Sequence, residues 1–93
     1  MIVRILGEGQ LRVDDSAAQE LNELDSKLES TVERNDESAF RPALEDLLER
    51  VRAIGRPVEP GELEPSELIL PGEGATMADV RKLLAGDGLI IPG

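Results

Sequence analysis

The chain has 93 residues, with 20 acidic against 10 basic side chains and a formal net charge of −10. This length predicts one domain, residues 1–93. The acidic balance argues against binding to nucleic acid or directly to anionic lipid, and the absence of cysteine excludes disulfides, thiol nucleophiles and thiolate metal sites.

The first predicted element is a β-hairpin, with strands at residues 1–6 and 10–13 around the loop Gly7-Glu8-Gly9. A three-residue loop with Gly9 in the left-handed region places Ile5 opposite Leu11 and Arg4 opposite Arg12. Alternation then gives one apolar face and one polar face. The apolar face holds Val3, Ile5, Leu11 and Val13, and the polar face holds Arg4, Gln10 and Arg12.

The same glycine loop could instead bind a phosphate, but its context does not fit. A dinucleotide fingerprint requires a third glycine and then a helix, whereas Gln10-Leu11-Arg12 reads as a strand. A P-loop requires Gly-Lys-Ser/Thr, which is absent here. The loop is therefore interpreted as a turn.

Two amphipathic helices are predicted next. The first begins at Ser16, with Gln19 completing a capping box, and its apolar stripe is Leu21, Leu24, Leu28 and Val32. The second is capped by Asp36 or Ser38 and ends at Gly55, and Pro42 predicts an irregular first turn. Its apolar face holds Phe40, Leu44, Leu47, Leu48, Val51 and Ile54. The short link makes the two helices antiparallel neighbours, packed on the apolar face of the hairpin.

The remaining elements complete an α+β domain with the order ββααβαβ. Leu68-Ile69-Leu70 predicts a short third strand. Thr76 and Asp79 form a capping box for a helix that ends at Gly86 and buries Met77, Val80, Leu83 and Leu84. A second Gly-Glu-Gly, residues 72–74, precedes this helix without a nearby lysine, so no anion site is expected there. Leu89, Ile90 and Ile91 predict a final strand.

Catalytic and metal-binding chemistry is sparse. The chain has no histidine, tryptophan or tyrosine, and its serines have no base beside them. Glu20 and Glu23 share a helical side, but no EF-hand spacing exists. We therefore expect no catalytic residues, no metal site and no cofactor, and predict that the protein is not an enzyme.

Charged side chains are the candidate binding residues. Nine acidic residues stand against Lys27 and Arg34 between Asp14 and Glu37, so Glu20, Glu23 and Glu29 are candidate contacts for a basic partner, with plain solubility as the alternative. Arg4 and Arg12 repel each other if they face across the hairpin. They are expected either to pair with the domain's own acids, such as Glu8 or Asp14, or to contact an acidic group on a partner.

The chain resembles the PspA-associated domain family (PspAA) almost from end to end. The resemblance lies in the opening MIVRILGEGQLRVDD, in LNELDSKLE, and in the tail ELEPSELILPGEGATMADVRKLLAGDGLIIPG. Such proteins are encoded beside PspA, the phage-shock protein that coats and protects stressed membranes. The resemblance implies a role in this envelope-stress response and supplies no catalytic residues.

These observations together predict a non-enzymatic accessory or regulatory domain that binds a PspA-like coiled-coil protein. The alternatives are a self-assembling module, such as a homodimer formed through sheet edges or the helical hairpin, and a sensor of a small ligand or cation. No apolar run spans a membrane and the N-terminus lacks a signal peptide, so we expect a cytoplasmic location. The partner would bring the domain to the inner membrane face.

Overall fold

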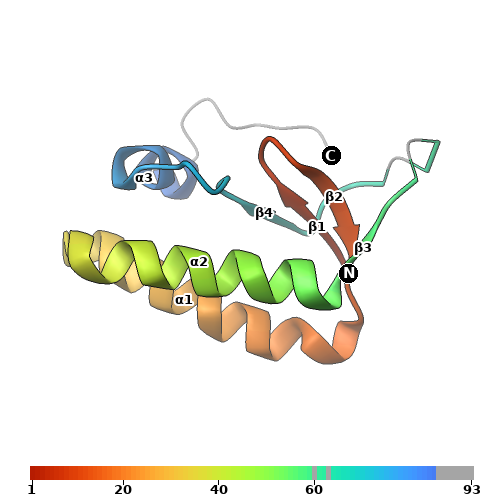
Figure 1. The fold of residues 1–93 in the computed structure, drawn as a ribbon, viewed down its shortest axis with the longest axis horizontal. Coiled ribbons are helices and arrows are strands. Elements are labelled where there is room, and N and C mark those ends of the chain that lie inside the picture. The colour runs from red at the N-terminus through yellow and green to blue at the C-terminus, as the bar shows by residue number, and fades with distance from the viewer. Residues whose placement is uncertain (60, 63, 86–93) are drawn as a thin grey trace.

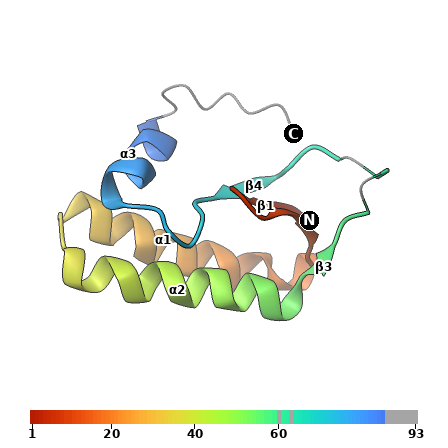
Figure 2. The ribbon, with the colours of Figure 1, turned by 45° about the horizontal axis from the view of Figure 1, so that its top comes forward.

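Two layers make up the part of the chain that the computed structural model describes, residues 1–59, 61–62 and 64–85 (Figure 1). One layer is an antiparallel helical hairpin, α1 (Ala18–Glu33) and α2 (Glu37–Ile54). The other holds a mixed sheet and α3 (Met77–Ala85), which cover the same side of that hairpin (Figure 2). The sheet strands are β1 (Ile2–Ile5), β2 (Gly9–Arg12), β3 (Arg56–Pro57) and β4 (Leu68–Leu70). The predicted α+β class is confirmed.

The β1–β2 hairpin forms as predicted, but its register is shifted by two residues. Val3 lies opposite Leu11 and Arg4 lies opposite Gln10, so the predicted facing of Arg4 and Arg12 is wrong. The turn centres on Gly7, where the amide of Glu8 donates to the carbonyl of Ile5 at 2.9 Å. Gly7 (φ 87°) and Gly9 (φ 116°) both lie in the left-handed region, which two glycines allow without strain. Because a shift of two keeps the parity of the side chains, the predicted faces survive.

The sheet has the order β3-β2-β1-β4 within the described residues. β4 confirms the short strand predicted at Leu68-Ile69-Leu70 and pairs parallel with β1, while β3 pairs antiparallel with β2. Sequence reasoning missed β3, because a two-residue strand that contains a proline carries no alternation. The predicted strand at residues 89–91 and the helix end at Gly86 lie outside the described residues.

The core lies between the two layers. The apolar faces of β1 and of both long helices meet there, and Leu70, Met77 and Val80 extend the core toward α3. The fully buried members are Val3, Ile5, Val13, Leu21, Leu28, Leu44, Leu47, Leu48, Val51 and Leu70. Four other residues that were expected in the core are only half-buried: Leu11, Leu24, Ile54 and Leu83. Leu24 lies on the edge of the α1 stripe, where the two helices meet solvent.

The helices begin at capping residues, but two predictions about their starts, at Ser16 and at Pro42, are wrong. Asp14, rather than Ser16, starts the first helical segment: its carboxylate accepts from the amide of Ser16 at 2.9 Å, and a 3-10 turn (Asp15–Ala17) precedes α1. Asp36 caps α2 through the amide of Ala39, and α2 is helical from Glu37, so Pro42 causes no irregular first turn. Pro42 nevertheless lies inside the helix, where it lacks the amide that would donate to the carbonyl of Ser38. Reciprocal bonds between Thr76 and Asp79 confirm the capping box of α3.

Two arginines fix α3 on the helical hairpin. Arg41 of α2 donates to the carbonyl oxygens of Glu73 (2.7 Å) and Ala75 (3.1 Å), just before α3 begins. Arg81 of α3 donates to the carbonyl of Val32 (3.2 Å) and to Oδ1 of Asn35 (2.7 Å), at the end of α1. These bonds tie α3 and the loop before it to α2 and to the end of α1.

Candidate functional site

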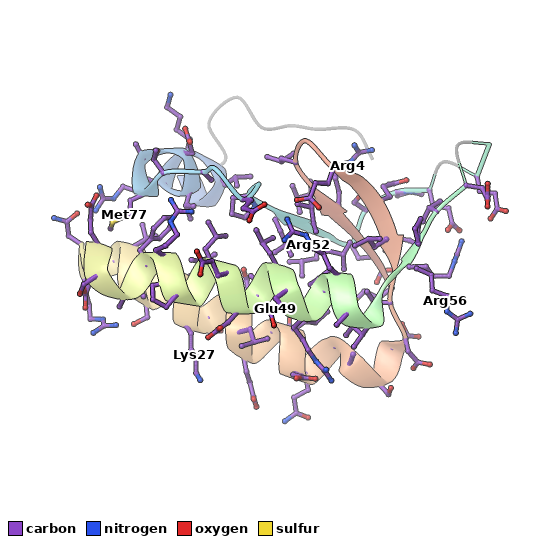
Figure 3. All side chains as sticks on the ribbon, in the orientation of Figure 1. Arg4, Lys27, Glu49, Arg52, Arg56 and Met77 are labelled. Carbon is purple, nitrogen blue, oxygen red and sulfur yellow. The ribbon has the colours of Figure 1, made fainter. Side chains whose placement is uncertain are left out.

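The outer face of the sheet carries the two candidate arginines. Arg4 extends from the side of the hairpin that faces away from the helices (Figure 3). Arg12 pairs with Glu64 at 2.5 Å and lies 3.7 Å from Glu62, both on the connection between β3 and β4. The side-chain amide of Gln10 donates to Oγ of Ser66 at 2.9 Å, on the same connection.

Intramolecular pairing of Arg12 was thus anticipated, but with the wrong acids, since Glu8 and Asp14 have other contacts. The true partners lie about fifty residues farther along the chain. A signal did exist in the sequence: the connection carries four glutamates, Glu59, Glu62, Glu64 and Glu67, and no basic residue. Such a segment is suited to cover a basic sheet face.

Arg52 brings the two Gly-Glu-Gly loops together. Its guanidinium binds both carboxylate oxygens of Glu8, from the first loop, and lies 3.6 Å from the carboxylate of Glu73, from the second. The hydrogen bond from Arg52 holds the pKa of Glu8 below its ordinary value. Gly72 lies so close to the hairpin turn that an added Cβ would sit 2.6 Å from the carbonyl oxygen of Leu6. Both loops therefore have structural roles, in agreement with their interpretation as a turn and as the segment before a helix.

The three candidate glutamates of α1 do not form one surface. Glu20 forms an ion pair with Arg50 of α2 at 2.9 Å. Glu23 is exposed on the outer side of α1, while Glu29 is half-buried next to Asp25. Glu20 and Glu29 are nine residues apart, about two and a half helical turns, which places them on opposite sides of α1.

Asp25 is a half-buried carboxylate on the flank of the α1 stripe. Burial and the charge of Glu29 raise its pKa above the ordinary value. A raised folded-state pKa means that the folded domain binds this proton more tightly than the unfolded chain does. The contribution of Asp25 to stability therefore rises as the pH falls through the folded-state pKa, and its charged form destabilises the domain at neutral pH.

We therefore expect Asp25→Asn to raise the melting temperature at pH 7, with the gain shrinking toward about pH 3, where aspartate is protonated in either state. Circular dichroism melts across this range measure the effect. Asp46→Asn is the matched control, because it removes the same charge from an exposed position. Equal gains in both variants would mean that the domain responds to net charge alone.

A groove runs between α1 and α2 on the side away from the sheet. Its lining comes from Glu20 and Leu24 of α1 and from Asp46, Glu49, Arg50 and Ala53 of α2. Ala53 lies two residues after the buried Val51, about 200° around the helix, and so faces away from the core. Figure 3 shows the same separation, with Arg52 pointing toward the sheet and Glu49 away from it.

Asp46, Glu49 and Ala53 were not among the candidate residues from the sequence. Their spacing at i, i+3 and i+7 marks one face of α2, which was a usable signal. What the sequence could not supply is the side on which α1 packs. That packing joins this face of α2 to Glu20 and Leu24.

Within the described residues, no group of three or more acidic side chains is arranged to hold a metal ion. In the same part of the chain, no helix combines the length and the apolar character needed to cross a bilayer.

Comparison with known proteins gives one result. No curated protein and no solved structure matches the chain significantly. A family model described as PspA-associated protein, PspAA, matches residues 1–93, the whole chain. The same span carries the hairpin, the helical layer and the capped third helix described above. The chain therefore belongs to the PspA-associated protein family.

Proposed function

We propose that this protein is a non-enzymatic accessory or regulatory domain of a PspA-type membrane-stress response, and that it acts by binding the coiled-coil protein PspA. The observation that carries this proposal is the match of the entire chain to a family named for its association with PspA. The protein would act in the cytoplasm and reach the inner membrane face through its partner.

Charge supports a protein partner with basic surface. The chain has a formal net charge of −10. In α1, five acidic residues stand against Lys27 alone. A surface of one sign raises the rate of encounter with a partner of the opposite sign, and salt screens this effect. A coiled coil offers charged stripes between its apolar seams, and a basic stripe would meet this requirement.

Isothermal titration calorimetry of the domain against purified PspA from the same organism tests the proposal. We expect saturable binding that weakens as the salt concentration rises. An unrelated acidic domain of equal net charge serves as the control for nonspecific attraction. The absence of binding at low salt, or equal binding by the control domain, would refute the proposed function.

One observation favours the alternative of self-assembly. β4 lies at one end of the described sheet and consists of the apolar run Leu68-Ile69-Leu70. Among the described residues β4 pairs on one side alone, with β1, and a strand edge without a partner can pair with a second chain. Sedimentation velocity of the isolated domain over a range of concentrations tests this role: a dimer supports it, and a monomer throughout contradicts it.

A further inference from the structure

Among the described residues, the groove between α1 and α2 brings carboxylates without an ion pair together with two apolar side chains, Leu24 and Ala53. Arg12 on the sheet is bound by Glu64, and Arg52 is bound by Glu8. In the groove, Glu20 and Arg50 pair with each other, while Asp46 and Glu49 make no ion pair with any described residue. Acidic groups are therefore available on the α2 side of the groove.

Two apolar side chains in the groove lining, Leu24 and Ala53, suit close approach by another helix. Leu24 is half-buried between the two helices, and Ala53 is exposed beside it. Helices pack with their axes about 8–10 Å apart, and small side chains at the contact allow the shorter distances. A helix can also be seated in a groove between two others through a few apolar contacts flanked by charged side chains.

We propose that this groove seats one α-helix of the coiled-coil partner. That helix would place a small or aliphatic residue on Leu24 and Ala53 and basic side chains beside Asp46 and Glu49. This inference rests on the proposed function. It excludes Glu29 and the two arginines of the sheet from the main contact, because they lie on other sides of the molecule.

The charge component is tested with the double variant Asp46→Asn with Glu49→Gln. Rim charges act mainly on association, so we expect its on-rate for PspA at low salt to fall about threefold to tenfold, with a weaker salt dependence. The matched control is Glu59→Gln with Glu67→Gln. It changes the net charge equally at exposed positions on the connection between β3 and β4. Surface plasmon resonance at two ionic strengths measures both variants.

The packing component is tested with Ala53→Tyr, which fills part of the groove. We expect its Kd for PspA to rise about tenfold or more, because a well-packed contact loses its fit. Ala53→Ser is the control, because serine is nearly as small as alanine, and it should bind like the unmodified protein. Thermal melts of both variants should match the unmodified domain, since Ala53 is exposed.

A crosslink locates the contact directly. The chain contains no cysteine, so Ala53→Cys introduces a unique attachment point for a photoactivated crosslinker. We expect this variant to crosslink to PspA and Glu67→Cys not to do so.

The outcomes separate the groove from the proposed function. If the unmodified domain binds PspA and the groove variants bind equally well, the groove assignment is wrong and the proposed function stands. If the unmodified domain does not bind PspA, both are wrong. If Ala53→Tyr abolishes self-association rather than PspA binding, the occupant is a second copy of this chain, which also overturns the inference.

Discussion

Leu28→Ala is expected to lower the free energy of unfolding by about 2–5 kcal/mol, the usual cost of removing a buried leucine side chain. Leu28 is 1% exposed and belongs to the core cluster between the two layers. Domains of this size are marginally stable, with about 5–15 kcal/mol in total, so the variant retains only part of its stability. Urea unfolding followed by circular dichroism measures the loss, because the chain lacks the tryptophan and tyrosine that fluorescence requires.

Leu24→Ala is the matched control, one turn earlier on the same helix. Leu24 is half-buried in the groove between α1 and α2, so its truncation opens no enclosed cavity. We expect a loss of about 1 kcal/mol or less. Equal losses in the two variants would show that Leu24 belongs to the core, as the helical periodicity alone suggested.

Gly72→Ala is expected to destabilise the domain by about 1–3 kcal/mol, the range for overpacking a close contact. The added Cβ would lie 2.6 Å from the carbonyl oxygen of Leu6, a backbone atom that can move only if the hairpin turn moves with it. The amide of Leu6 already donates to the carbonyl of Leu70 at 3.0 Å, which fixes that turn against β4. Urea unfolding measures the loss.

Gly74→Ala, two residues away in the same loop, gives the comparison. A Cβ there meets nothing within 4 Å, and Gly74 is not among the glycines with positive φ. We expect no loss of stability and a gain of up to about 1 kcal/mol, because alanine restricts the unfolded chain. A similar loss in both variants would mean that the loop requires glycine for flexibility rather than for space.

Local patterns predicted the elements well where one periodicity or one cap dominates. The stripe of α2, the cap at Asp36 and the pair Thr76 and Asp79 each depend on residues within a few positions of one another. The hairpin register failed because two glycines flank Glu8 and either can occupy a left-handed position. The strand β3 was missed because its pairing with β2 depends on where α2 ends, and not on its own two residues.

The candidate site shows the same division. The sequence identified an acidic first helix, and Glu20 from that set does line the groove. It grouped Glu20 with Glu29, although their spacing places them on opposite sides of α1. The sequence did not identify Asp46, Glu49 and Ala53, because this face of α2 lines a groove only when α1 packs beside it.

The sequence by itself determined the α+β class, the antiparallel helical hairpin, the two faces of the β-hairpin and the structural character of both Gly-Glu-Gly loops. Each of these follows from side-chain periodicity or from the conformational preferences of neighbouring residues. Only the tertiary structure decided that Arg52 forms ion pairs with Glu8 and Glu73, one from each loop, and that Glu64 binds Arg12. It also decided that α1 and α2 form a groove lined by acids without an ion pair among the described residues. These contacts join residues that are far apart in the chain, and long-range packing of the two layers sets which of them meet.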